Sequence, residues 1–391
     1  MRLLISTGEV SGDLQGSFLV KALIEEAVSQ QLSLDIMAIG GSRMKSAGAD
    51  LIFDTTSIGA IGLWEAVPYL MPTLRAQSIV DNLLKTKSPD ALVLIDYMGP
   101  NIRLGNKVRK LFPQMPIIYY IAPQEWAWRF GDSGTTDLIG FTDKILAIFK
   151  EEERFYSKQG GNVTWVGHPM LDNLQELPER ENACIKLGVD PSKKIVLMFP
   201  ASRSQELKYL LPTLAEAAYL MQKEDPSIYF IVPAGLEAFE SYIKDILDKY
   251  YVVGKVIPSA EVDSLKPSMF SVADFALGKS GTINMELALH LIPQIAVYKV
   301  SKITALIAKH ILRFNVEHIS PVNLLLKERL IPEFVQEDFK ASIVAEKSIA
   351  IMEDNNLRSI IKTGYNRLRL ELGEKGVTKR AANEIIRLIS K

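Results

Sequence analysis

The sequence contains a single cysteine, Cys184, which excludes an internal disulfide and a cluster of thiolate metal ligands. It also has almost no net charge, because 45 Lys and Arg residues nearly balance 46 Asp and Glu residues. Without a field of one sign, no nucleic acid partner is expected. Uncharged apolar runs of about 18 residues are missing too, so no transmembrane helix is predicted. Glu9 and Asp13 stand where a secretory signal would still be apolar, and a cytoplasmic location is expected.

Two ligand-binding signatures are also missing. Asp-x-Asp occurs nowhere in the chain, and the histidines show no metal-ligand spacing. Neither a metal ion nor another cofactor is therefore expected. The glycines after the first apolar run, Gly8, Gly12 and Gly16, follow the pattern G-x-x-x-G-x-x-x-G. Dinucleotide binding calls for G-x-G-x-x-G, so binding of NAD is not predicted.

A chain of 391 residues exceeds what one compact core usually holds, and two domains are expected. In the first half, short apolar runs alternate with amphipathic stretches such as 17–28 and 72–84. Continuous apolar runs are typical of parallel strands covered on both faces, which predicts a doubly wound α/β fold. The strands predicted in this half are 2–6, 34–40, 91–96, 116–122, 144–149 and 163–167.

The same pattern restarts after the polar stretch 175–194. A helix is expected from about Glu206 to Met221, and the C-terminal segment is predicted to be helical. The predicted strands of this second half are 195–199, 228–233, 252–257, 273–278 and 293–298. Ligands of such sheets bind beyond the carboxyl ends of the strands, so the loops that follow strands are the candidate sites.

Asp96 ends the apolar run 91–96 and is a candidate general base. The alternative is that it caps the following helix. Pro100 and Gly99 delay that helix, which weakens the alternative. Asn101 lies just beyond and is more typical of a helix cap than of a ligand.

Two loops of the second half carry groups suited to phosphate. Ser280, Gly281 and Thr282 open a helix, where backbone N–H groups and hydroxyls bind anions, although the same residues are also common helix caps. Glu286, one turn further, is suited to a ribose diol. Arg203 follows a strand and is suited to a pyrophosphate, unless it pairs with Glu206 on the next turn.

Trp126 and Trp128 follow another predicted strand, together with Gln124, Glu125 and Arg129. The polar neighbours indicate a loop at a ligand site, while core packing is the alternative. His168 follows a strand and a glycine. A lone histidine is usually structural, but this one lies at the carboxyl end of a strand.

The stretch 58–75 is apolar around most of its circumference, with Glu65 its only charge before Arg75. Such a stretch usually belongs to a core. Its Trp64 and Tyr69 also fit a helix lying in a membrane interface.

Taken together, these segments resemble the lipid-A-disaccharide synthase family. The family's G-E-x-S-G-D is present at 8–13, and its I-D at Ile95 and Asp96. The resemblance is collinear over essentially the whole chain, and seven short motifs in order are far more specific than any one of them. The remaining five are W-A-W at 126–128, V/I-G-H at 166–168, S-R-x-x-E at 202–206, S-G-T…E at 280–286 and N-L-L at 323–325.

The resemblance implies a GT-B fold, in which two Rossmann-like domains face each other across a cleft. It implies an acceptor- and membrane-facing domain over 1–172 and a UDP-sugar-binding domain over 190–360, with helices from about 360 to 391 packing on the first domain. The implied reaction joins UDP-2,3-diacylglucosamine to 2,3-diacylglucosamine 1-phosphate (lipid X) with inversion and without a metal. The implied location is the cytoplasmic face of the inner membrane. The oligomeric state stays open, a homodimer included.

The resemblance also implies roles for single residues. Asp96 takes the proton from the acceptor's 6-hydroxyl, and the stretch 58–74 dips into the bilayer. The acceptor is expected to contact Glu9, Ser11, Asp13, Asn101, Trp126 and His168. UDP is expected to contact Arg203, Glu206, Ser280, Gly281, Thr282, Glu286 and Asn323.

The chain departs from the family pattern at Ala201, where glycine is common, at Met98–Gly99 in place of Pro-Asp, and at 122–128, where the first residue is usually serine. These departures bear on acyl-chain and acceptor preference. Two other functions stay open: another GT-B enzyme acting on UDP-GlcNAc-type sugars, such as a UDP-sugar epimerase, and a non-catalytic, membrane-peripheral protein that binds nucleotide sugars.

Overall fold

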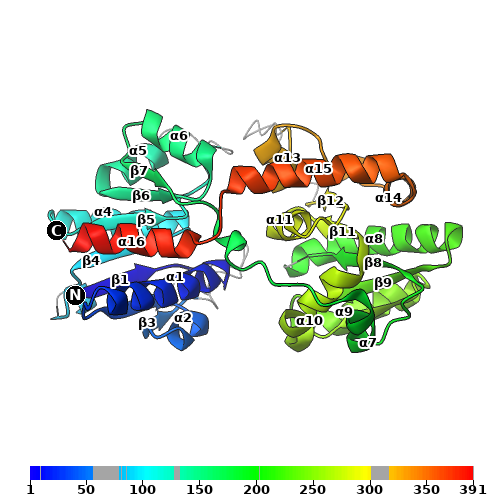
Figure 1. The fold of residues 1–391 in the computed structure, drawn as a ribbon, viewed down its shortest axis with the longest axis horizontal. Helices are drawn as coiled ribbons and strands as arrows, with labels where there is room; N and C mark the ends of the chain where they lie inside the picture. The colour runs from blue at the N-terminus through cyan, green and yellow to red at the C-terminus, as the bar shows by residue number, and fades with distance from the viewer. Residues whose placement is uncertain are drawn as a thin grey trace. The chain divides into compact units, whose positions relative to one another are not determined.

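The computed structural model describes residues 1–8, 10–55, 79–80, 82–84, 86–126, 133–201, 203–300 and 317–390. The chain divides into two compact units, Met1–Asn173 with Leu372–Lys391 and Leu174–Glu371 (Figure 1). The chain returns to the first unit at Leu372, later than the expected position near residue 360. Each unit is built on one parallel sheet, as the apolar runs predict.

The described part of unit 1 has a seven-stranded sheet in the order β3-β2-β1-β4-β5-β6-β7. Its central strand β4 is buried along its whole length, as expected for a parallel strand covered on both faces. The sequence predicted no strand at 50–54, because charged residues bound this short apolar run. The strands are β1 (Arg2–Ser6), β2 (Asp35–Gly40), β3 (Asp50–Asp54), β4 (Ala91–Ile95), β5 (Ile117–Tyr120), β6 (Lys144–Ala147) and β7 (Val163–Trp165).

The helices of unit 1 include one that begins earlier than the sequence indicated. Helix α1 (Val10–Ser29) begins within the glycine-rich stretch, before the amphipathic stretch 17–28 that the sequence indicated. The glycines allow close packing: a Cβ on Gly16 would lie 2.7 Å from Met44 Sδ, and one on Gly12 would clash with Thr7. The other helices are α2 (Ser42–Ser46), α4 (Met98–Leu111), α5 (Ser133–Phe141), α6 (Lys150–Lys158), η2 (Pro169–Leu171) and α16 (Val377–Ile389).

Helix α16 belongs to unit 1 although it comes from the end of the chain. It packs against α1, and Figure 1 shows the two helices side by side. The Asp172 carboxylate accepts hydrogen bonds from the backbone N–H of Gly376, at 2.6 Å, and of Thr378, at 2.8 Å. A negative charge at a helix N-terminus is favourable, so Asp172 fastens the returning chain to this unit.

Unit 2 has a six-stranded sheet in its described part, in the order β10-β9-β8-β11-β12-β13. The sequence predicted no strand at β13, because three residues are too few to show a hydrophobic pattern. The strands are β8 (Lys194–Phe199), β9 (Ile228–Pro233), β10 (Gly254–Ile257), β11 (Ala273–Lys279), β12 (Gln294–Tyr298) and β13 (Glu333–Val335). The helices are α7 (Arg180–Leu187), α8 (Ser204–Glu224), α9 (Glu237–Lys249), α10 (Ser259–Val272), α11 (Thr282–Leu289), α13 (Pro321–Leu326), η3 (Gln336–Asp338), α14 (Ala341–Glu353) and α15 (Asn355–Leu372).

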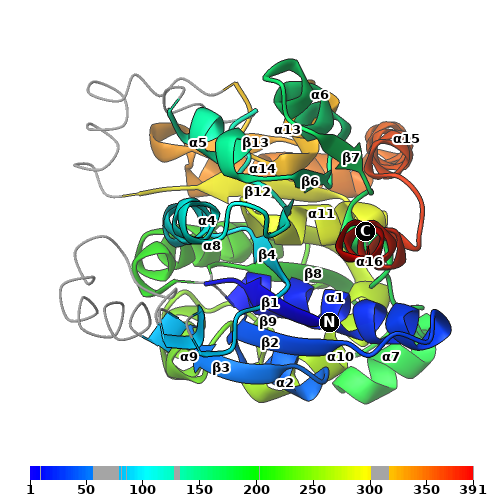
Figure 2. The ribbon, with the colours of Figure 1, turned by 90° about the vertical axis from the view of Figure 1, so that its left-hand side faces the viewer.

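Both sheets reverse their strand order at one point, between β1 and β4 in unit 1 and between β8 and β11 in unit 2 (Figures 1 and 2). Ligands of open parallel sheets bind at such points, beyond the carboxyl ends of the strands. The segments after these strands are therefore the candidate ligand-binding segments.

Among the described helices, none combines the length and apolar character needed to span a bilayer. The stretch 58–74, for which core and interface were the two alternatives, lies outside the described residues, as does the predicted helix 72–84 over most of its length.

Candidate active site

Asp96 directly follows β4, at the point where the sheet of unit 1 reverses its order. Its φ of 49° and the φ of 53° at Tyr97 place two consecutive non-glycine residues in the left-handed region. Such strain persists only where the surroundings hold it, and it concentrates at functional sites. The Asp96 N–H donates to the carbonyl of Ile121 at 3.1 Å, and the Asp96 carbonyl accepts from the hydroxyl of Tyr119 at 2.8 Å.

The carboxyl group of Asp96 is suited to accept a proton. Burial raises the pKa of this carboxyl, against a hydrogen bond from the backbone of Tyr97 that lowers it. A carboxylate whose pKa is raised is a stronger base. The alternative role of helix cap does not hold, because α4 begins at Met98 with Tyr97 as its cap residue and without a side-chain cap bond.

Asn101 supports Asp96 from the first turn of α4. Its side chain is 1% exposed, and its amide Nδ2 donates to the carbonyl of Asp96 at 2.8 Å. Its Oδ1 accepts from the hydroxyl of Ser6 at 2.9 Å. Asn101 thus joins the ends of β1 and β4. The amide is bonded to the protein's own groups and positions the backbone of Asp96, while a contact of Asn101 with the acceptor stays a prediction.

Asp13 has a structural role in unit 1, and its contact with the acceptor stays a prediction. It is 2% exposed, and its carboxylate accepts from the N–H of Gly41 at 2.8 Å and from those of Arg43 and Met44 at 3.1 Å. These bonds satisfy the first turn of α2, as a helix cap does. Ser11 is exposed on the first turn of α1, and its contact with the acceptor stays a prediction. Glu9 lies outside the described residues.

His168 and Trp126 belong to one aromatic cluster around Phe149. The Phe149 ring lies 5.1 Å from that of His168 and 5.6 Å from that of Trp126. Burial lowers the pKa of His168 to about 4, so the imidazole is neutral at pH 7 and carries no charge for a phosphate. Its Nδ1 accepts from the N–H of Met170 at 3.2 Å. These contacts favour the structural alternative for His168. Trp128 lies outside the described residues.

Two acids of unit 1 are buried: Glu152, which the sequence did not single out, and Glu125, which the sequence placed beside Trp126 in a candidate loop. Glu152 of α6 is fully buried and accepts from the N–H of Ala122 at 3.1 Å and of Ile148 at 2.9 Å. Glu125 is 7% exposed and accepts from the hydroxyl of Thr135. Glu152 stands in a run of charged residues that reads as a solvated helix face, so no local signal separates it from its exposed neighbours.

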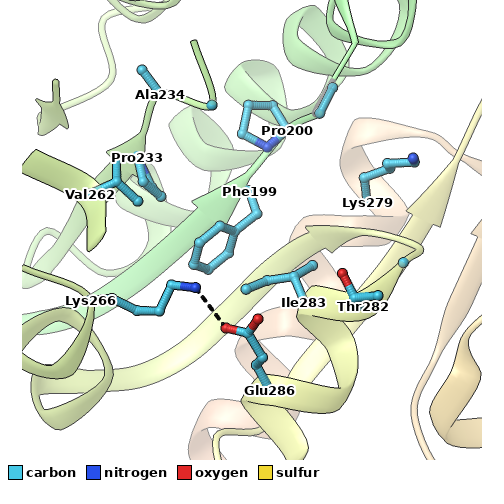
Figure 3. A pocket seen from close by; sticks show the side chains of 13 residues that line it. Phe199, Pro200, Pro233, Ala234, Val262, Lys266, Lys279, Thr282, Ile283 and Glu286 are labelled. Carbon is cyan, nitrogen blue, oxygen red and sulfur yellow. Dashed lines mark hydrogen bonds and ion pairs between the residues drawn. The ribbon is translucent and has the colours of Figure 1, made fainter. Parts of the chain in front are cut away.

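Unit 2 contains a cavity of about 360 Å³ at the carboxyl ends of β8, β9 and β11 (Figure 3). It brings together three residues predicted to contact UDP: Gly281, Thr282 and Glu286. One side is apolar, and two lysines that the sequence analysis missed complete the lining. The lining residues are Phe199, Pro200, Ala201, Pro233, Ala234, Gly235, Val262, Lys266, Lys279, Gly281, Thr282, Ile283 and Glu286.

The turn into α11 is firmly held on one side and open on the other. The hydroxyl of Ser280 donates to the carbonyl of Ile319 at 2.5 Å, so Ser280 anchors the turn. The N–H of Gly281 donates to Oδ1 of Asn284 at 2.8 Å. A Cβ on Gly281 would meet no atom within 4 Å, which leaves room for a ligand against the backbone.

Glu286 and Lys266 form an ion pair across the cavity, with 2.9 Å between Oε2 and Nζ. Figure 3 shows the two side chains pointing toward each other from α11 and α10. A carboxylate has several acceptor positions, and one contact with an ammonium leaves others for a diol.

Arg203 does not pair with Glu206, which was the alternative from the sequence. Glu206 instead binds Lys279, with 2.9 Å between Oε1 and Nζ, because β11 ends beside the first turn of α8. Arg203 is the exposed cap residue of α8 and has no ion-pair partner among the described residues. Its guanidinium is available to an anion.

Asn323 is fully buried and forms two hydrogen bonds with the backbone of Ile331. Its Nδ2 donates to that residue's carbonyl at 2.8 Å, and its Oδ1 accepts from its N–H at 3.0 Å. Both ends of the amide are thereby bonded within the protein, and a contact of Asn323 with UDP stays a prediction. His318, weighed in the sequence only for metal spacing, is 7% exposed, and neither ring nitrogen has a partner in the described structure. Its neighbour Ile319 is the residue that holds Ser280.

A family model for lipid-A-disaccharide synthetase matches residues 3–388. The chain is 58% identical over 388 residues to a lipid-A-disaccharide synthase from Prochlorococcus marinus (strain MIT 9313), covering 99% of both chains. It is 44% identical over 386 residues to the enzyme of that name from Gloeothece citriformis, again over 99% of both. The identity is 32% over 390 residues with that of Geobacter metallireducens, covering 100% of this chain and 98% of the relative.

Solved structures show the fold. MnaA of S. aureus with UDP has a TM-score of 0.67 at 14% identity, covering 100% of this chain and 97% of that one. The UDP-GlcNAc 2-epimerase of Neisseria meningitidis reaches 0.62 at 11% identity, covering 100% of both chains. WaaG, a glycosyltransferase of lipopolysaccharide biosynthesis, reaches 0.56 at 13%, covering 98% and 99%. The two parallel sheets thus form a GT-B fold, and on the evidence of the full-length sequence matches the chain belongs to the lipid-A-disaccharide synthase family of glycosyltransferases.

Proposed function

We propose that the chain transfers the diacylglucosamine unit of UDP-2,3-diacylglucosamine to lipid X, giving lipid A disaccharide 1-phosphate and UDP. The observation that carries this proposal is the 58% identity, over 99% of both chains, to a protein named for that synthesis. The UDP-N-acetylglucosamine 2-epimerases resemble the chain in fold alone, at 10–11% identity, and so do not favour the rival function.

In unit 1, Asp96 is the proposed general base. Its carboxylate takes the proton of the acceptor's 6-hydroxyl while that oxygen bonds to C1 of the donor sugar. The bond between C1 and the phosphate oxygen breaks on the opposite face, which inverts C1, and UDP leaves with the electron pair. A general base is most effective when its pKa lies near the working pH. Burial raises the pKa of Asp96 in that direction, which suits this step.

In unit 2, the proposed UDP site is the cavity beside α11. Glu286 accepts hydrogen bonds from the ribose, and Thr282 faces the diphosphate beside the open side of Gly281. The exposed guanidinium of Arg203 adds positive charge. Fixed donors aimed at a leaving group stabilise the charge that develops on it, and we propose that they do so without a metal ion.

The reaction is tested with purified protein, UDP-2,3-diacylglucosamine and lipid X, by following UDP release and the acylated disaccharide by mass spectrometry. We expect both products in equal amounts and an unchanged rate in EDTA. Consumption of UDP-GlcNAc alone, without release of UDP from the acylated pair, would establish the epimerase-type rival. Binding of UDP without turnover of any sugar would establish the non-catalytic alternative.

We further propose that the chain acts at the cytoplasmic surface of the inner membrane, through the apolar stretch 58–74. Replacement of Trp64, Leu70 and Met71 by serine is expected to free the protein from liposomes, because each change removes apolar area from the bilayer interface. Co-sedimentation with vesicles of bacterial phospholipids measures the effect. If the triple variant sediments like the wild type, or loses its fold by circular dichroism, the stretch belongs to the core.

A further inference from the structure

Lys279 is the last residue of β11 and lines the cavity next to the turn into α11. Neither the sequence pattern nor the motifs of the family resemblance singled it out. It directly precedes Ser280, so its place is fixed by the same strand that fixes the turn. The side chain is 19% exposed, so most of it lies out of bulk water.

The charge of Lys279 is balanced differently from that of Lys266. Lys266 pairs with Glu286, and both of these residues line the cavity, so their charges cancel within it. Lys279 pairs with Glu206, which is not among the lining residues. Figure 3 shows the ammonium of Lys279 directed away from the Lys266–Glu286 pair. Among the described charged residues that line the cavity, Lys279 is therefore the one whose counter-ion stands outside the lining.

Lys279 also retains donors for a ligand. An ammonium has three N–H donors, and the described structure gives this one a single partner, Oε1 of Glu206 at 2.9 Å. The opposite oxygen of Glu206 is buried and has no hydrogen-bond partner in the described structure. Glu206 thus holds the lysine in one orientation with one contact.

The turn into α11 has fewer free backbone donors for a diphosphate than its sequence suggests. The N–H of Ser280 already donates to the carbonyl of Val297 at 2.9 Å, and that of Gly281 to Asn284 at 2.8 Å. Two donors that the sequence of the turn offers are thereby used inside the protein. A diphosphate carries several acceptor oxygens and at least two negative charges, so a cationic donor in addition to Arg203 supplies contacts that these two N–H groups do not.

We propose that Lys279, held by Glu206, binds the diphosphate of the donor nucleotide and stabilises UDP as it leaves. This inference rests on the proposed function, since it takes the cavity as the UDP site. Low exposure strengthens the contact between ammonium and phosphate relative to bulk water. The ion pair with Glu206 fixes the ammonium beforehand, so little reorganisation accompanies the transfer.

The test compares Lys279→Met with Lys279→Arg by calorimetric titration with UDP and with uridine, which has no phosphate. Lys279→Met is expected to weaken UDP binding about ten- to hundredfold, the usual worth of one charge-assisted hydrogen bond, and to leave uridine binding unchanged. Lys279→Arg is expected to restore most of the UDP affinity. The matched control is Lys244→Met, which removes an exposed lysine on α9 of the same unit and should bind UDP like the wild type.

Equal weakening of UDP and uridine by Lys279→Met would overturn the proposal, because the lysine would then act on the shape of the cavity. Unchanged UDP affinity would overturn it as well. If Lys279→Met unfolds at a lower temperature, Lys279→Arg decides: a folded arginine variant with lost UDP affinity refutes the role of the charge. A wild-type protein that binds no UDP refutes the proposed function itself.

Discussion

Replacement of Asp96 by asparagine is expected to lower turnover by about two orders of magnitude or more, the usual contribution of a general base. The amide is nearly the same size as the carboxyl and still accepts the hydrogen bond from the backbone of Tyr97, but it cannot take a proton. UDP affinity should be unchanged, because the proposed UDP cavity is formed by residues of unit 2 alone. The measurement is the rate of UDP release, beside calorimetric titration with UDP.

The pH dependence gives the same test a second readout. The base must be ionised, so the rate of the wild type should rise as the pH rises through the pKa of Asp96, which burial places above the ordinary value. This rise of the rate with pH, the acid limb of the profile, should be absent from the residual activity of Asp96→Asn. A variant that keeps more than about a tenth of wild-type turnover, with the limb intact, would show that another group takes the proton.

Glu152→Gln is expected to make folding less sensitive to alkaline pH. Burial is the main cause that raises the pKa of Glu152 to about 8, against hydrogen bonds from Ile148, Phe149 and Ala122 and with a smaller push from Asp96. Between the ordinary pKa and this value, the unfolded chain has lost the proton and the folded chain keeps it. Stability therefore falls as the pH rises, by about 2 kcal/mol between about pH 6 and 8 for one such group.

Glutamine cannot titrate, so the variant should gain about 2 kcal/mol relative to the wild type over that range. Urea unfolding at the two pH values measures this. Glu153→Gln, the next residue of α6, is the control and should keep the wild-type pH dependence. A stability difference that does not change with pH would mean that the three backbone donors outweigh burial and keep Glu152 ionised.

Glu152 also holds the segment that is hydrogen-bonded to the candidate base, Asp96. It holds the N–H of Ala122, while the preceding residue, Ile121, offers its carbonyl to the N–H of Asp96. Tyr156, one turn further along α6, donates its hydroxyl to the carbonyl of Pro123 at 2.7 Å. The strained backbone at Asp96 is thus hydrogen-bonded to a segment that two side chains of α6 hold in place.

The sequence by itself determined the layout of this protein. Continuous apolar runs separated by amphipathic stretches predicted two parallel α/β halves. A strand that is covered on both faces of its sheet must be apolar at every position, so its own sequence shows it. The same periodicity placed Asp96 and the Ser280–Thr282 turn at the carboxyl ends of strands. Seven short motifs in order indicated the family, which the full-length matches confirmed. The predicted strands missed only β3 and β13 of the described ones, whose short runs carry little pattern.

Only the tertiary structure decided which polar side chains stay available to a ligand. Asp13, Asn101 and Asn323 stand in or beside family motifs, yet each is buried and bonded to backbone groups of the protein itself. The partner of Glu206 is a lysine at the end of a strand distant in sequence, and not the neighbouring Arg203. A buried polar group must find a partner, and the fold brings that partner from far along the chain. Local sequence carries the hydrophobic pattern that forms the sheets, but it does not carry the distances that pair one side chain with another.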